Sequence, residues 1–324
     1  MVLQIFTLIP ALVKSIFGSL CDFCYSAVDS MGRFTTYVLT ALAAIFWGAN
    51  FNLAKPVVAE MHPYVAGATR YLMAATIMLL VTQYRRECIP LRHLKVYVIL
   101  GLMGVFGFNL FFFLGMQSTS ATNGALIMAI NPMLTSLLAY VFLRQQPSYR
   151  QLLGFPIGVI GVAIVVLGAG AQVHVASGDV LILAANLSWA FYTVFARKLM
   201  PTDTSGIAST TGIMVVGALA LTAVALFSGE HFVLPSWHAG SALLMMTVGG
   251  GVLAYLFWNA GIARLGASQA AIFLNLVPVS SLVIAAFEGM PPTQAQLIGG
   301  AVVIGAVTFA SLPVGGAAAD RQPR

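Results

Sequence analysis

Charged residues are scarce in this sequence. Only 7% of the 324 residues are charged, whereas 60% are hydrophobic and the mean hydropathy is +0.94. A soluble domain cannot hide so much apolar surface, because its exterior needs far more polar side chains. The composition excludes a soluble globular protein and predicts an all-α polytopic membrane protein. The net charge of +6 does not indicate a nucleic-acid partner, since the basic residues lie between the apolar runs.

Cysteine is also rare, and the common catalytic motifs are missing. Cys21 and Cys24 form a single CxxC without a second pair, and Cys88 lies in a basic loop. This pattern predicts no metal site and no cofactor. The sequence has no HExxH, Walker A loop, nucleophile elbow or paired intramembrane aspartates. We therefore predict no catalytic residues and expect a protein that is not an enzyme.

The first 32 residues differ from the rest of the chain. Apolar residues recur there at helical spacing from Ile5 to Phe23, with polar residues between them. This pattern predicts an amphipathic helix on the membrane surface, and no basic segment of a signal peptide precedes it. Met31 offers a second start site. We therefore interpret residues 1–32 as an N-terminal extension that need not be native, and we assign it no function.

Ten apolar runs follow, each long enough to cross a bilayer. Short loops join them, and the loops on one side hold nearly all the basic residues, which places both termini in the cytoplasm. We expect a multi-pass protein of the cell inner (plasma) membrane. The predicted spans are 35–54, 64–82, 95–116, 121–142, 150–169, 179–198, 206–228, 240–262, 268–287 and 295–313.

The fourth and ninth runs have matching sequences. Residues 121–139 align with residues 267–285 after a shift of 146 positions, so that Pro132 meets Pro278. A proline inside a helix removes a backbone donor and crowds the preceding turn, so each run should kink or open there. Interrupted helices at matching positions of two halves indicate a transport site. Pro132 and Pro278 are therefore predicted hinges.

The repeat extends over the whole membrane region. Trp47–Lys55 aligns with Trp189–Arg197, and Gly154 aligns with Gly299. Each half has five predicted spans, and an odd number inverts the second half relative to the first. We therefore predict two inverted five-helix repeats with a ligand cavity between them. The expected domains are the extension 1–32, the first repeat 33–170, the second repeat 171–315 and a cytoplasmic tail 316–324.

These motifs resemble the drug/metabolite transporter superfamily, in its ten-helix branch with two EamA domains. The resemblance rests on AxxWGxNFxxxK, which includes Trp47 and Lys55, and on the QLLG and QLIG runs that end at Gly154 and Gly299. It covers about residues 34–313. The aromatic content is similar to that of the aromatic amino-acid exporters of this group. The resemblance implies a transporter that exports small metabolites.

Two basic residues are candidates for binding a substrate carboxylate. Arg70 lies near the start of the second span, and Lys55 lies at the end of the first span on the same side. A guanidinium offers a planar bidentate clamp and an ammonium a point charge. The alternative is that both side chains extend to the headgroups and anchor their helices.

Amides and aromatic rings complete the predicted substrate site. Amides bind zwitterions and neutral polar ligands, and aromatic walls suit flat apolar ligands. The alternatives are hydrogen bonding between helices for the amides and contact with lipid or its interface for the rings. The predicted binding residues, beyond Lys55 and Arg70, are Trp47, Asn50, Tyr71, Asn109, Asn131, Trp189, Tyr192, Tyr255, Trp258 and Asn275.

We expect export of small amphipathic metabolites, aromatic and other neutral amino acids first, by alternating access. No acidic residue lies well inside a predicted span, which disfavours a proton relay and favours facilitated export or exchange. The alternatives are a lipid-handling protein with a cavity open to the bilayer, or an exporter of another class such as purines or drugs. The expected partners are a small-molecule substrate and the lipid bilayer, and the expected state is a monomer.

Overall fold

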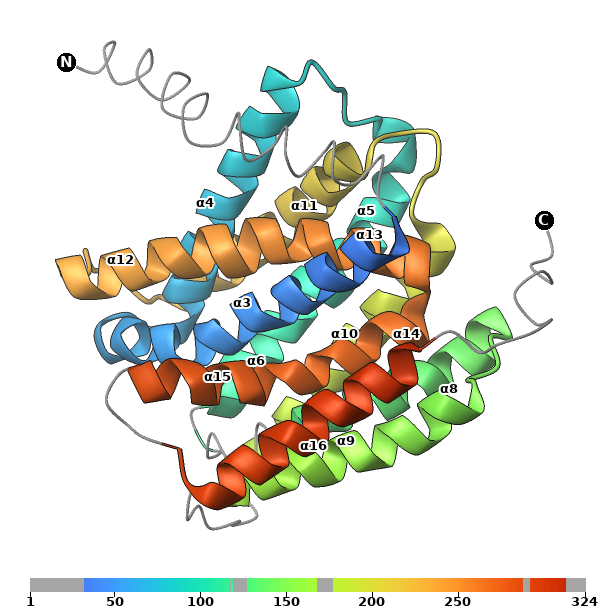
Figure 1. Ribbon diagram of the computed structural model, residues 1–324. Helices are drawn as coiled ribbons and strands as arrows, with labels where there is room; N and C mark the ends of the chain where they lie inside the picture. The colour runs from blue at the N-terminus through green and yellow to red at the C-terminus, as the bar shows by residue number, and fades with distance from the viewer. Residues whose placement is uncertain (1–31, 117, 119–126, 168–176, 288–291, 313–324) are drawn as a thin grey trace.

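The protein is helical throughout the part that the computed structural model describes, which is residues 32–116, 118, 127–167, 177–287 and 292–312 (Figure 1). A helix satisfies its own backbone groups, as a lipid environment requires. The first half contains α3 (Arg33–Glu60), α4 (Pro63–Tyr84), η2 (Leu91–His93), α5 (Leu94–Leu100), η3 (Gly101–Gly107), α6 (Phe108–Met116), α8 (Asn131–Leu143) and α9 (Tyr149–Leu167). The second half contains α10 (Gly178–Leu199), α11 (Gly206–Phe227), α12 (Trp237–Met245), η4 (Met246–Leu253), α13 (Ala254–Leu265), α14 (Ala267–Ala271), η5 (Ile272–Asn275), α15 (Leu276–Phe287) and α16 (Gln294–Ser311).

Apolar helices of the described residues overlap the predicted runs, but not all of these helices are long enough to cross a membrane. Three runs are shorter apolar helices within the described residues, Ile127–Leu143, Tyr149–Val165 and Gln294–Ala310. The predicted extension, apart from Gly32, and the tail 316–324 lie outside the described residues. Seven described stretches are long and apolar enough to cross a membrane: Arg33–Glu60, Pro63–Tyr84, Leu91–Gly115, Gly178–Leu199, Gly206–Phe227, Trp237–Leu265 and Ala267–Ile284.

The first helix is longer than the sequence pattern predicted. It runs to Glu60, through Pro56, rather than ending near residue 54. A proline removes one backbone donor but does not end a helix whose other bonds remain. Lys55 therefore lies within α3 and not at its end, which corrects the prediction of its position.

The halves of the chain pack against each other in a reciprocal pattern. In Figure 1, α3 lies between α13 and α15, and α9 runs beside α16. In return, α10 packs against α6 and α8, and α4 packs against α11. The first helix of each half is thus surrounded by the third and fourth segments of the other half. The interface between the halves runs through the centre of the bundle.

The third segment of each half contains a π-helical stretch. These stretches are η3 and η4, and Gly104 and Gly250 within them are 146 positions apart. A Cβ atom on Gly104 would overlap the ring of Tyr192, and one on Gly250 would overlap the amide of Asn50. Glycine permits this close approach, because it leaves space for a side chain from the opposite half.

The fourth segment of each half is interrupted just before its proline. In the first half the helix has a turn at Ile130, and Pro132 lies in the first turn of α8. In the second half the 3₁₀ stretch η5 separates α14 from α15, and Pro278 lies in the first turn of α15. The matched breaks follow from the missing backbone donor of each proline.

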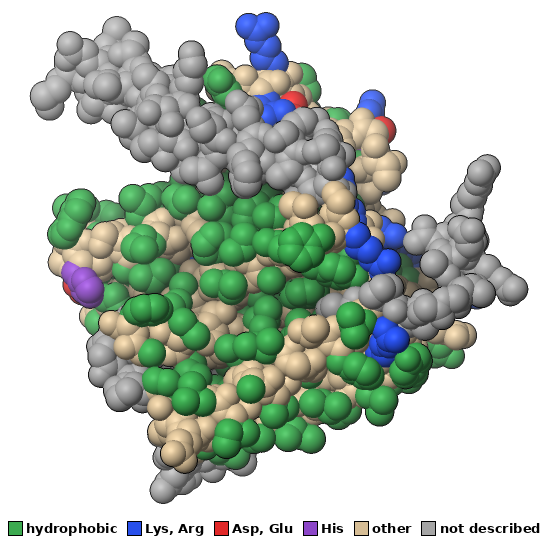
Figure 2. Space-filling view, in the orientation of Figure 1, with side chains coloured by type: hydrophobic (Ala, Val, Ile, Leu, Met, Phe, Trp, Pro, Cys, Tyr) green, Lys and Arg blue, Asp and Glu red, His purple; other side chains and the backbone are tan. Residues whose placement is uncertain are grey.

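The two ends of the bundle differ in charge. We call one the basic end, where α4, α10 and α13 finish near Arg85, Arg197 and Arg264, and the other the Glu60 end. Figure 2 shows Lys and Arg along the upper and right margins of one face, and His beside an acidic side chain at the left. An apolar belt lies between these margins (Figure 2).

Candidate functional site

A cavity lies between the two halves of the chain. Its walls come from α3, α4, α6, α10 and the η4, α13 and α15 region, so neither half encloses it alone. The lining residues near helix ends, such as Ala54 and Arg70, place it toward the Glu60 end. The cavity is lined by Trp47, Asn50, Ala54, Arg70, Tyr71, Phe108, Asn109, Phe112, Phe113, Met128, Trp189, Met246, Tyr255, Leu274 and Val277.

Three aromatic rings form the floor of the cavity. The ring centroids of Trp47 and Trp189 are 5.0 Å apart with an interplanar angle of 84°, and Tyr255 lies 6.0 and 5.6 Å from them. Edge-to-face packing of this kind adds to the stabilisation from burial alone. Trp47 and Trp189 align across the repeat, so equivalent residues of the two halves meet here.

Hydrogen bonds to the π-helical glycines fix two of these rings. Trp47 Nε1 donates to the carbonyl oxygen of Gly250 over 2.9 Å, and Tyr255 Oη donates to that of Gly104 over 2.8 Å. A π-helical stretch departs from the regular bonding pattern of an α-helix. Side chains of the floor therefore bond to backbone at the two irregular segments.

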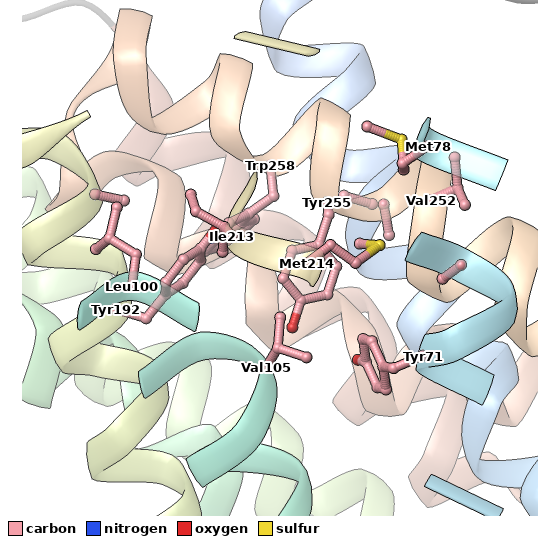
Figure 3. Close-up of a cluster of buried hydrophobic side chains, with 14 of the residues drawn as sticks. Tyr71, Met78, Leu100, Val105, Tyr192, Ile213, Met214, Val252, Tyr255 and Trp258 are labelled. Carbon is pink, nitrogen blue, oxygen red and sulfur yellow. The ribbon is translucent and has the colours of Figure 1, made fainter. Parts of the chain in front are cut away.

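A dense polar and aromatic layer fills the bundle between this floor and the basic end. We call Tyr192, Thr210, Trp258 and Asn259 the Tyr192 layer. Tyr192 Oη donates to Asn259 Oδ1 over 2.6 Å, and Asn259 Nδ2 donates to Thr210 Oγ1 over 3.0 Å. Figure 3 shows Tyr192 and Trp258 among buried apolar side chains, with Tyr255 between them and Tyr71. The layer closes the cavity toward the basic end.

Arg70 brings a buried positive charge to the cavity. It is 5% exposed, its Nη2 donates to the carbonyl of Met246 over 3.3 Å, and its guanidinium lies 5.1 Å from the centre of the Tyr71 ring. No ion pair formed between described residues includes Arg70. Burying an unpaired charge is costly, so a side chain placed this way favours an anionic ligand group. Arg70 does not extend to the headgroups, which was the alternative interpretation.

The structure brings seven of the twelve predicted binding residues together at the cavity. Trp47 and Asn50, about one turn apart on α3, both line it. Lys55 lies in α3, and its side chain is outside the described part of the structure. The seven are Trp47, Asn50, Arg70, Tyr71, Asn109, Trp189 and Tyr255.

The other four predicted binding residues are buried away from the cavity. Tyr192 and Trp258 belong to the Tyr192 layer, with Trp258 fully buried 5.2 Å from the ring of Trp47. Asn131 donates to the Asn186 carbonyl over 3.1 Å and to the Asn186 side chain, joining α8 to α10. Asn275 is fully buried beside Gly158, and neither polar atom of its amide has a partner.

Several lining residues were missed because they are ordinary apolar side chains. Phe108 and Phe112 stack with their centroids 5.6 Å apart, and the i, i+4 spacing would have paired them. Met128 and Leu274 are 146 positions apart, so the repeat offset would have linked them. Apolar residues fill a membrane sequence, and spacing alone does not separate those that face a cavity from those that face lipid.

The arrangement can bind an amphipathic small molecule. The lining provides aromatic faces, two methionines, two amides and one guanidinium. Among the described residues no group of three His, Cys, Asp or Glu side chains could hold a metal ion.

Comparisons with known proteins agree with this chemistry. The sequence profile of the EamA-like transporter family matches residues 34–167 and 176–312. The chain is 36% identical over 290 residues to the uncharacterized transporter YyaM of Bacillus subtilis (strain 168), covering 87% of this chain and 95% of that protein. It is 24% identical over 217 residues to a probable terminal-alkyne amino-acid exporter of Streptantibioticus cattleyicolor, covering 67% of this chain and 72% of that protein.

The fold also has a solved counterpart. A crystal structure with 19% sequence identity superposes with a TM-score of 0.74, covering 86% of this chain and 97% of the other. At this identity the likeness concerns the fold alone.

Proposed function

Since this chain belongs to the EamA-like transporter family, we propose that it exports small amphipathic metabolites, aromatic and other neutral amino acids first. Transport proceeds by alternating access through the cavity between its halves. One observation carries the proposal: the cavity is lined by both halves, and the equivalent residues Trp47 and Trp189 meet at its floor 5.0 Å apart. A site at such an interface is reached from either side when the halves rock against each other.

The architecture proposed for this carrier is ten spans in two inverted five-helix repeats. The reciprocal packing of α3 and α10, and the π-helical stretches at matching positions, support it. The short apolar helices ending at Leu143, Val165 and Ala310 complete the ten. The breaks before Pro132 and Pro278 serve as hinges, because a segment without a regular bonding pattern bends with least resistance.

The proposed orientation puts the basic end, and both termini, in the cytoplasm of a cell with this protein in its plasma membrane. Lysine and arginine accumulate on the cytoplasmic side of membrane proteins. The cavity then faces outward, and the Tyr192 layer forms the cytoplasmic barrier. Inward opening requires α10 and α13 to separate, which breaks the bond between Tyr192 and Asn259.

The proposed substrates follow from the chemistry of the lining. Aromatic faces suit a flat apolar side chain, and the unpaired Arg70 suits a carboxylate. The named amino-acid exporter among the relatives supports the same class. Among the described residues no acidic side chain lines the cavity, which supports facilitated export or exchange rather than proton coupling.

Transport by purified protein in liposomes tests this proposal. Labelled phenylalanine, tryptophan and leucine, and a fluorescent lipid, are followed in parallel with and without a proton gradient. We expect the amino acids to move without a proton gradient, and Trp47→Ala to reduce transport while inserting normally. Movement of the lipid alone would favour the lipid-handling alternative, and strict dependence on a proton gradient would contradict the coupling mode.

A further inference from the structure

We infer that Asn50, Arg70 and Trp189 form a head-group subsite that recognises the free ammonium and carboxylate of an α-amino acid together. Arg70 and Trp189 donate to the carboxylate, and the Asn50 side-chain oxygen accepts from the ammonium. The inference rests on the proposed function and assigns which groups the substrate must present.

Unpartnered polar atoms carry the argument. Arg70 Nε, Trp189 Nε1 and Asn50 Oδ1 are all buried without a hydrogen-bond partner, and all three residues line the cavity. Arg70 and Trp189 are only 5% and 4% exposed. Buried polar groups in proteins are nearly always paired, and an unpaired one in a binding cavity calls for a ligand group. Two donors and one acceptor call for an anionic acceptor and a nitrogen donor.

The placement of these groups fits a single amino-acid head. Arg70 Nη2 bonds to the carbonyl of Met246, and the Asn50 amide lies against Gly250, four positions further along η4. Both contacts therefore fall within about one turn of the same helical stretch. A carboxylate and an ammonium on the same carbon, each extended by one hydrogen bond, bridge a separation of this size.

Charge distinguishes this ligand from a simple anion. An aryl carboxylate would satisfy Arg70 and Trp189 but would leave the Asn50 oxygen unpaired. The lining contains no carboxylate, so an ammonium finds its acceptor at Asn50 and further attraction at the faces of neighbouring rings. A cationic amine without a carboxylate would lie beside the unpaired Arg70 and be repelled.

The repeat provides one such subsite rather than two. Tyr192 lies three residues after Trp189, as Asn50 does after Trp47, and its hydroxyl is already bonded to Asn259. The tyrosine ring also lies over Gly104, where the second subsite would be. The cavity therefore binds one amino-acid head in one orientation.

Calorimetric titration of the full chain in detergent tests this subsite. The probes are L-phenylalanine, 3-phenylpropionate, N-acetylphenylalanine and phenethylamine, which share one ring and differ in the head group. We expect phenylalanine to bind at least tenfold more tightly than each analogue. Asn50→Leu should abolish the preference over 3-phenylpropionate, and Arg70→Gln should abolish the preference over phenethylamine. Asn50→Asp retains an acceptor and should keep the first preference.

Asn52→Leu is the matched control, because Asn52 is on the same helix, bonds to the carbonyl of Ser281 and does not line the cavity. It should leave all preferences unchanged. A wild-type preference below tenfold, a preference that survives Asn50→Leu, or no binding of any probe would overturn the subsite. The liposome assay decides the proposed function separately, since a carrier that moves phenylalanine but binds all four probes equally would retain its function without this subsite.

Discussion

The two halves of the chain place equivalent residues at the same interface but use them differently. In the first half Trp47 bonds to the carbonyl of Gly250, and Asn50 lies over that glycine. In the second half the Trp189 nitrogen has no partner, and Tyr192 lies over Gly104. A small amide leaves space on one side of the floor, whereas a tyrosine ring fills the other side. One side-chain difference within a duplicated scaffold thus determines which end is hollow.

The side of the floor that Tyr192 fills also has more of its polar groups hydrogen-bonded. Tyr192, Asn259 and Thr210 satisfy one another in a chain of hydrogen bonds, while the hollow side retains unpaired donors. Fully satisfied polar networks rigidify the region they occupy, and partly satisfied ones leave binding capacity. Under the proposed function, Tyr192 contributes to closure of the cavity and Asn50, its counterpart in the first half, contributes to ligand binding. Substitutions at matched positions of the two halves test this contrast.

The largest effect is expected at the glycines. Gly104→Ala introduces a Cβ atom into the fixed ring of Tyr192, whereas Gly250→Ala meets only the end of the Asn50 side chain, which can rotate. Overpacking against a rigid neighbour costs about 1–3 kcal/mol. We expect Gly104→Ala to lower the unfolding free energy by this amount, and Gly250→Ala to lower ligand affinity more than stability.

Unfolding in detergent, followed by thermal and chemical denaturation, measures these differences. Gly249→Ala is the control, because its Cβ atom would lie 3.5 Å from Phe46 Cδ1, an ordinary contact. Equal stability of the Gly104→Ala and Gly249→Ala proteins would show that the ring of Tyr192 yields, and the comparison would lose its structural basis.

The next largest difference in stability is expected between substitutions of Asn131 and Asn275, which lie at the breaks in the fourth segments. Asn131 bonds to Asn186, whereas both polar atoms of the buried Asn275 are unpartnered. We expect Asn131→Leu to cost about 1–2 kcal/mol of stability, because it leaves the Asn186 carbonyl and amide oxygens without their donor. Asn275→Leu removes an unsatisfied amide of similar shape and should be neutral or stabilising.

Denaturation midpoints and transport rates are measured together for both variants. Asn131→Leu should lower transport along with stability, since the residue joins α8 to α10. A destabilising Asn275→Leu would mean that this amide has a partner in the membrane, and the contrast between the halves would disappear.

Substitutions of Trp47 and Trp189 should differ in their effect on stability by less than those of the two asparagines. Trp47→Phe loses the hydrogen bond to Gly250, worth about 0.5–1 kcal/mol within a membrane. Trp189→Phe loses no bond of the unliganded protein, because its nitrogen has no partner. Both substitutions place a smaller ring in a packed site and lose packing energy, so we expect the first to lower the unfolding free energy by the additional hydrogen bond, and the second to weaken phenylalanine binding more than the first. Identical stability losses would contradict the assignment of the unpaired donor.

The sequence was sufficient for the parts of this comparison that depend on composition and periodicity. Low charge and long apolar runs predicted the helical membrane class, and Trp47 and Trp189, which align across the repeat, were both predicted binding residues. For Arg70 the sequence left two positions open, one facing a cavity and one extended to the headgroups, because a cation within a span is costly unless it is paired or functional. These predictions depend only on the composition and residue spacing of individual helices.

The other features of the site depend on how the helices pack against one another, which the sequence does not specify. The i, i+3 spacing grouped Tyr192 with Trp189 but could not show that Tyr192 points away from the cavity, toward Asn259. The sequence carried no sign of the π-helical stretches in the third segments. Asn131 was grouped with ligand-binding amides because a hydrogen bond to a substrate and one to Asn186 require the same side chain.

The smallest effect is expected at the basic end, where an ion pair joins the loops of the two halves. Asp203 accepts from Arg92 Nη2 over 2.7 Å and pairs with His93 Nε2 over 2.9 Å. Partial desolvation raises the pKa of Asp203, but a local backbone bond and the charges of His93 and Arg92 outweigh it and hold the pKa below 3.8. A carboxyl group whose pKa is lowered by folding stabilises the protein above its unfolded pKa, and this stabilisation is lost as the pH falls through the folded value.

Asp203→Asn should therefore lower the melting temperature slightly at pH 6, and the difference from the unmodified protein should vanish once the pH is well below 3.8. Exposed ion pairs are weak and screened by salt, so the difference should also shrink at high ionic strength. The control is Glu230→Gln at the Glu60 end, where the partner His62 is 3.6 Å away and a smaller change is expected. A pH-independent difference at Asp203 would show that the aspartate acts through packing rather than charge, and that the two ends are not distinguished by their electrostatics.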